Sequence, residues 1–145
     1  MLQKIGYICA ELRKPVEDTV YRKVLSKRAI GDVGYVYFAE MHLPPGLSTD
    51  PSLTFIKTGK SGNAGVRLSK LQTANPFELT LRDSISVTNI GQAEGIAHTA
   101  AQNYHERGEW YRFPSSAKAR LMIRRIRQTL RNHNLILNIK KSNII

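Results

Sequence analysis

Two short segments in the first half of the chain have the composition of β-strands, and the stretch between them limits the possible folds. GYVYFAEMHL (34–43) and LTFIKTG (53–59) are rich in β-branched and aromatic residues, which are typical of strands. The residues between them, PPGLSTDPS (44–52), are dense in proline, glycine and serine and predict a loop. We expect the two strands to pair antiparallel through this long connection.

The rest of the chain alternates between helical and extended patterns. Apolar residues recur at helical spacing in four stretches: 15–29, 61–76, 89–108 and 117–133. Residues 77–87 predict a third strand, and 109–113 (EWYRF) a short extended piece. Asn89 is placed to cap the third of these helices and Gly108 to end it. This mixture predicts an α/β chain of the α+β type.

The positive charge is concentrated at the two ends of the chain. The formal net charge is +11. Residues 1–30 contain seven Lys or Arg and three acids, residues 31–113 seven and eight, and residues 114–145 eight and none. We therefore expect a basic N-terminal helical arm, a near-neutral core, and a basic C-terminal helix and tail over these three ranges. The excess favours an anionic partner: nucleic acid first, an anionic membrane surface second, a small anion third.

Cysteine content and apolar patterning bear on the compartment. The single cysteine, Cys9, cannot form an internal disulfide or a cysteine-based zinc site. The N-terminus lacks the apolar core and cleavage site of a signal peptide, and no stretch has the length of a membrane span. We expect a soluble, intracellular, cytoplasmic protein; nucleoid, phage-infected cell and nucleus are not distinguished.

The loop after the second strand raises the question of a nucleotide site. Gly59-Lys60-Ser61 supplies the Gly-Lys-Ser end of a P-loop. A P-loop also needs a glycine five residues before Gly59, and that position is Thr54, inside an apolar strand. The sequence therefore argues against an NTPase.

Several short motifs follow one another in a defined order along residues 33–113. They are GYVYFA (34–39), KTG (57–59), Arg67, LQTANP (71–76), AEGIAH (93–98) and GEW (108–110). Taken together they resemble the GIY-YIG nuclease superfamily, in particular a compact branch of phage and meiosis-associated proteins with a KIG-like second motif. The resemblance implies a small three-stranded antiparallel sheet flanked by helices, with helical extensions at both ends.

The resemblance also implies an activity, namely endonuclease cleavage of DNA with one divalent ion, Mg²⁺ or Mn²⁺. Glu94 matches the metal-binding glutamate, and Arg67 the helix arginine. The first tyrosine matches Tyr37, or Tyr35 if the glycine is taken literally; strand alternation puts both on one side. Lys57 stands where the superfamily commonly has a second tyrosine.

These residue types suit phosphodiester hydrolysis. A carboxylate can hold a hydrated divalent ion, and an arginine offers a fork of donors to phosphate. A tyrosine or lysine beside a cation can lose its proton and assist the water. His98 lies four residues after Glu94 on the same helix face, a spacing that permits a shared ion. Each of these side chains also has an ordinary structural explanation, as a packed or solvent-facing group.

The basic residues suggest where DNA is held. We expect contacts from these side chains: Lys60, Lys118, Arg120, Arg124, Arg125, Arg127 and Arg131. Two departures from the family pattern, Lys57 and the presence of Glu109 where an asparagine is common, leave a second hypothesis open: a DNA-binding or regulatory protein that keeps the fold without the chemistry. A third is a basic accessory protein of a ribosome or virion.

Overall fold

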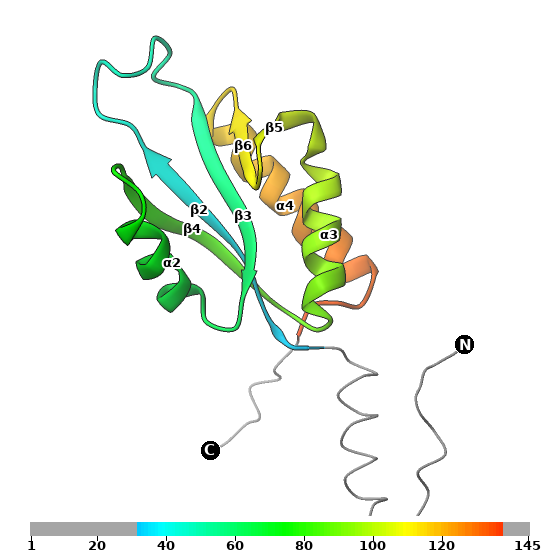
Figure 1. The fold of residues 1–145 in the computed structure, drawn as a ribbon. Coiled ribbons are helices and arrows are strands. Elements are labelled where there is room, and N and C mark those ends of the chain that lie inside the picture. The colour runs from blue at the N-terminus through cyan, green and yellow to red at the C-terminus, as the bar shows by residue number, and fades with distance from the viewer. Residues whose placement is uncertain (1–31, 138–145) are drawn as a thin grey trace, which may run out of the picture. The chain divides into compact units, whose positions relative to one another are not determined.

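The computed structural model describes residues 32–137, which contain five strands and three α-helices (Figure 1). In chain order the elements are β2 (Gly34–His42), β3 (Thr54–Ser61), α2 (Ala64–Thr73), β4 (Glu78–Val87), α3 (Ile90–Ala100), the short 3₁₀-helix η1 (Gln102–Tyr104), β5 (His105–Arg107), β6 (Trp110–Phe113) and α4 (Ser116–Asn132). The predicted helix at 15–29, the basic arm at 1–30 and Cys9 lie outside the described residues, so those predictions are not addressed.

All five strands join one antiparallel sheet in the order β4-β2-β3-β6-β5. The first two predicted strands pair with each other, and Tyr37 lies opposite Gly59. β4 pairs with the other edge of β2, with an irregularity between Phe38 and Ala39. The α+β class is confirmed, but the predicted three-stranded sheet is wrong, because β6 and β5 extend the sheet to five strands.

One of the two additional strands, β6, lies in the piece predicted as extended (109–113), whereas the other, β5, comes from a stretch that was predicted as the end of a helix. That helix, expected over 89–108, ends as α3 at Ala100, and His105–Arg107 becomes β5. Gly108 does not end a helix but turns the chain from β5 into β6, with a φ of +58° that suits glycine. β6 then pairs with the first half of β3. Helical spacing in the sequence carries no information on such a distant pairing.

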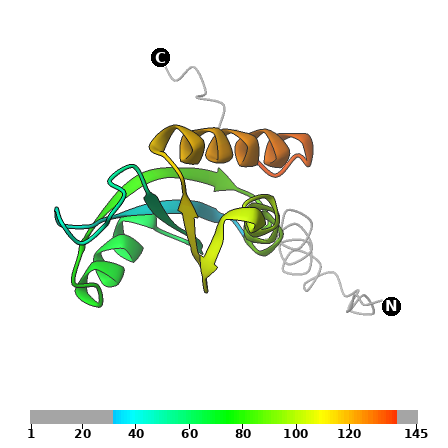
Figure 2. The same cartoon turned by 90° about the horizontal axis from the view of Figure 1, so that it is seen from above.

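Alternation along β2 separates two apolar clusters. Val36 and Phe38 point to one face and join the main core with residues of α3 and α4. Tyr37 and Ala39 point to the opposite face, where α2 covers them in a smaller cluster. Figure 2 shows α4 above and α2 below the sheet, with α3 along its side. The sheet is thus covered by helices on both faces.

The helix ends are capped in different ways. Asn63 accepts a hydrogen bond from the Val66 N–H at 3.0 Å and starts α2. Ser115 does the same for α4 through the Lys118 N–H. Asn89 precedes α3 as expected, but its side chain makes no cap hydrogen bond and instead donates to Gln92 Oε1. None of the described helices has the length and apolarity that crossing a membrane requires.

α4 is both basic and part of the core. Its buried residues all face the sheet: Ala119, Met122, Ile123, Ile126 and Leu130. After α4, Ile136 forms an isolated bridge with Val87 of β4, which fixes part of the stretch that the sequence left ambiguous. The proposed division of the chain into three parts stays a prediction, while α4 itself packs on the core that it was expected to extend.

Candidate functional site

The site lies where the pairing between β3 and β6 ends. β6 pairs with β3 only from Thr54 to Lys57. Beyond that point the backbone N–H of Thr58 still donates to the carbonyl of Glu109 at 3.0 Å. α3 then runs beside the remaining part of β3, as Figure 1 shows. Side chains from α3, from β3 and from the residue before β6 therefore meet at this edge.

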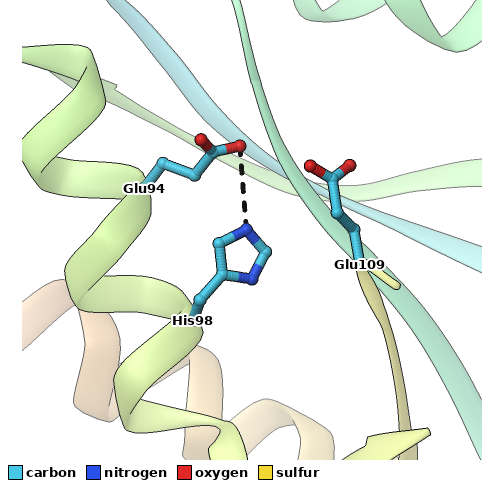
Figure 3. Close-up of side chains that lie close together, drawn as sticks. All are labelled: Glu94, His98 and Glu109. Carbon is cyan, nitrogen blue, oxygen red and sulfur yellow. Dashed lines mark ion pairs between the residues drawn. The ribbon is translucent and has the colours of Figure 1, made fainter. Parts of the chain in front are cut away.

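Glu94 and His98 project from α3, one turn apart, and Glu109 faces them from the position just before β6 (Figure 3). One ligand atom from each of the three lies within 4.8 Å of the others. Glu94 Oε2 and His98 Nε2 are 3.7 Å apart. The three side chains are partly buried, so they are ordered by packing and still open to a ligand. We call this group the β3-edge cluster.

Two lysines of β3 accompany the two carboxylates. Lys60 Nζ lies 3.5 Å from Glu94 Oε1, and the Lys57 ammonium donates a hydrogen bond to Glu109. Lys57 is opposite Ala39, on the sheet face that α2 covers, and its side chain is 12% exposed. Each carboxylate therefore has one cationic partner, and the acidic charge of the cluster is matched locally.

Tyr111 completes the surroundings of His98. Its hydroxyl lies 2.5 Å from His98 Nδ1. Burial raises the pKa of Tyr111, and the nearby Glu109 and Glu94 carboxylates raise it further, so the phenol keeps its proton at neutral pH. If His98 Nδ1–H donates to the phenol oxygen, the lone pair of Nε2 faces Glu94 and can bind a metal.

Tyr111 was missed from the sequence, although a signal existed. Residues 109 and 111 are two apart in an extended piece, and this spacing places their side chains on one face. The motif resemblance points to Glu109 alone, as the counterpart of an asparagine. Strand alternation from Glu109 would have predicted that Tyr111 lies on the same face.

The predicted tyrosines lie on β2, on the sheet face that also carries Lys57, and no described contact joins them to the cluster. Tyr37 is 1% exposed and packs over Gly59, where an added Cβ would lie 2.6 Å from its hydroxyl. This close approach gives Gly59 a packing role, in agreement with the argument against a P-loop. Within residues 32–137 the Tyr37 hydroxyl makes no hydrogen bond. Tyr35 is exposed near the start of β2, opposite Ser61 and Ser86.

Arg67 is not brought to the cluster by any contact. It is exposed on α2, which packs against the face of β2 that carries Tyr37. Its side chain makes no ion pair or hydrogen bond with another described residue, and only its backbone N–H bonds to Asn63. The structure thus joins Glu94, His98 and Lys57 of the predicted set, together with Lys60, and leaves Arg67 apart. The roles assigned to all of them stay predictions.

The basic side chains of α4 do not share one environment. Arg127 is half-buried and forms an ion pair with Asp83 at 2.5 Å. Arg131 hydrogen-bonds Gln128 at 3.2 Å. The remaining predicted DNA contacts on this helix are exposed: Lys118, Arg120, Arg124 and Arg125.

Comparison with known families corrects the resemblance drawn from the motifs. The model of the T5orf172 domain matches residues 34–132, from the start of β2 to the end of α4. This is a different family from the GIY-YIG superfamily, so the assignment to that superfamily and to its compact branch is wrong.

The match covers the sheet, all three described helices and the β3-edge cluster. Neither the curated proteins nor the solved structures that were compared with the chain include a match. The matched family is associated with nuclease-like and DNA-binding proteins, which is consistent with a DNA-related function. Because the match spans well over half of the 145 residues, the chain belongs to the T5orf172 domain family.

Proposed function

We propose that the chain is a metal-dependent DNA endonuclease whose reaction centre is the β3-edge cluster. The observation that supports this most directly is the approach of three potential ligand atoms, from Glu94, His98 and Glu109, to within 4.8 Å of one another. The family's association with nuclease-like and DNA-binding proteins supports DNA as the substrate. The net charge of +11 fits a polyanionic substrate.

The donor set of the cluster suits a divalent ion. Two carboxylates and one imidazole provide oxygen and nitrogen ligands from two separate elements. Mg²⁺ prefers oxygen ligands, whereas Mn²⁺ also accepts imidazole nitrogen, so we expect Mn²⁺ to bind better than Mg²⁺. A bound divalent ion supplies Lewis acidity and an activated water, which is what phosphodiester hydrolysis requires.

The two lysines beside the β3-edge cluster have distinct roles in this proposal. Lys60, with a side chain 49% exposed and close to Glu94, is placed to contact a phosphate oxygen. Lys57 is mostly buried and balances the charge of the Glu109 carboxylate through its hydrogen bond. The proposal does not depend on Tyr35, Tyr37 or Arg67, whose catalytic roles stay predictions.

A second function is favoured by one observation. Both carboxylates already have a lysine partner, Lys60 with Glu94 and Lys57 with Glu109. Such pairs would hold the edge together without any ion, and the chain would then bind DNA without cutting it. The two functions differ in whether a divalent ion enters the cluster.

Cleavage of supercoiled plasmid distinguishes them. We expect nicking in the presence of Mn²⁺ that is lost with EDTA and falls at least about 10²-fold in Glu94→Gln, which keeps the size of the side chain and removes the charge. Glu78→Gln is the matched control, because Glu78 is exposed at the start of β4. Equal nicking by Glu94→Gln would show that the centre lies elsewhere. No nicking, with plasmid still bound, would favour the binding protein.

A further inference from the structure

A hollow between β4 and α4 is lined by four of the nine arginines in residues 32–137. It is about 290 Å³ in volume and is lined by Arg82, Asp83, Arg120, Ile123, Arg124 and Arg127. None of these residues belongs to the β3-edge cluster. Four guanidinium groups against one lining carboxylate make this hollow well suited to an anion.

Two of the four arginines are already neutralised. Arg82 pairs with Glu40 at 3.2 Å and donates to the carbonyl and hydroxyl oxygens of Ser116 at 2.8 Å each. Arg127 pairs with Asp83. These contacts fix both side chains and join β4 to α4. These two arginines therefore form part of the lining of the hollow but add little to its positive charge.

The other two arginines have no such compensation. Arg120 and Arg124 are exposed, and neither makes an ion pair or a side-chain hydrogen bond within residues 32–137. They are four residues apart on α4, so their like charges are neighbours and repel each other. An anion between them would relieve this repulsion. Phosphate is the best match, because its oxygens fit the guanidinium fork.

The α4 arginines of the hollow belong to a longer row of basic side chains along this helix. Residues 120, 124, 127 and 131 follow the i, i+4, i+7, i+11 pattern that places side chains on one flank of a helix. At a rise of about 1.5 Å per residue the four cover about 16 Å, long enough to follow several backbone phosphates. We call them the arginine flank. Lys118 and Arg125 lie about 140–160° away around the helix from Arg120.

We propose that the arginine flank is a DNA-backbone subsite, in which Arg120 and Arg124 grip phosphates at the β4–α4 hollow while Lys118 and Arg125 do not touch DNA. This inference rests on the proposed DNA substrate and is independent of cleavage. In this proposal DNA is bound by contacts from one side of α4, and not by the general electrostatic attraction of all its basic residues.

The test compares two pairs of substitutions that remove the same charge from the same helix. One variant carries Arg120→Gln and Arg124→Gln, and the control carries Lys118→Gln and Arg125→Gln. Affinity for a short duplex is measured at several salt concentrations, in EDTA so that cleavage does not interfere. Thermal unfolding shows that both variants are folded.

We expect the flank variant to bind about 10–50-fold more weakly near 0.1 M salt, and its log–log salt slope to be shallower by about 1.8, the value for two lost phosphate contacts. The control should stay within about twofold of the unmodified chain, since only long-range charge is lost. Equal weakening of both variants would overturn the proposal in favour of diffuse attraction. So would a difference between the variants that appears with anionic phospholipid vesicles and not with DNA.

The outcome is separable from that of the proposed endonuclease. If the flank variant alone loses affinity but the unmodified chain never nicks plasmid with Mn²⁺, the subsite stands and the cleavage proposal fails. If plasmid is nicked and the two variants bind alike, the reverse holds.

Discussion

The β3-edge cluster and the arginine flank use charge in opposite ways. At the edge, Glu94 and Glu109 each meet a lysine, so opposite charges are matched within a few ångströms. On the flank, Arg120 and Arg124 have no acidic partner among the described residues. Ligand binding at the β3-edge cluster, where the charges are paired, should depend mainly on local geometry. Anion binding by the unpaired arginines of the flank should depend strongly on ionic strength. In our proposals the first region holds a metal ion and the second retains DNA.

The largest effect on the β3-edge cluster is expected from removal of the Tyr111 hydroxyl. Tyr111→Phe removes the hydrogen-bond partner of His98 Nδ1 and keeps the ring. Because such a partner orients a ligating imidazole, we expect Mn²⁺ affinity to fall by about 10–100-fold in calorimetric titration. The salt slope of DNA binding should be unchanged.

Tyr104→Phe serves as the control for this substitution. Tyr104 also lies beside the core, packed on Phe113 with ring centroids 4.7 Å apart, and is outside the cluster. Its loss of a hydroxyl should leave Mn²⁺ binding as it was. If both variants bind Mn²⁺ like the unmodified chain, His98 is not a ligand and the metal site as proposed fails.

A smaller effect, of opposite sign, is expected from Lys57. Lys57→Met removes the cation that pairs with Glu109 and keeps the length of the side chain. If an ion binds at the cluster, one repelling charge is gone, and Mn²⁺ affinity should rise by about two- to tenfold, as about 1 kcal/mol of charge interaction at such distances implies. Titration with Mn²⁺ measures this directly.

The same variant can break the comparison between the two regions. A shallower salt slope for DNA binding in Lys57→Met, with no gain in Mn²⁺ affinity, would mean that the edge lysine behaves like the arginines of the flank. The cluster would then be a second patch for DNA retention, and the binding-protein hypothesis would gain.

The sequence predicted the local elements better than the way they meet. β2 and β3 were expected at 34–43 and 53–59 and are observed within two residues of those bounds, because their apolar residues and the proline-rich loop are local signals. β5 was hidden at the end of a helical pattern, and it exists only because β6 is there to pair with it. Pairing of β6 with β3 joins residues more than 50 positions apart.

The candidate site shows the same division. The proximity of Glu94 and His98 follows from helical spacing alone and was predictable. The approach of Glu109 to both, and of Lys57 to Glu109, depends on the β3–β6 register, which no local pattern states. Tyr37 and Arg67 were assigned by motif, and the fold places Tyr37 in the cluster beneath α2, on the sheet face opposite the main core. A motif gives residue identity, and the sheet decides which residues share a face.

The last and smallest expected effect concerns stability at alkaline pH. Burial, with the Glu109 and Glu94 carboxylates, raises the pKa of Tyr111 in the folded chain. Above about pH 10 an unfolded chain releases this proton while the folded chain still holds it, so rising pH favours unfolding through this group. Below that pH both states are protonated, and the contribution is fully present.

Urea unfolding of the unmodified chain and of Tyr111→Phe at pH 9 and pH 10.5 isolates this contribution, because the other tyrosines and the lysines titrate in both. We expect the free energy of unfolding to fall less over this interval in the variant. Parallel losses would mean that the hydroxyl ionises as easily in the folded chain, which a phenol enclosed between His98 and two carboxylates would not do. The β3-edge cluster would then be open to water, as the arginine flank is. The two regions would differ only in that the cluster contains acidic groups and the flank basic ones.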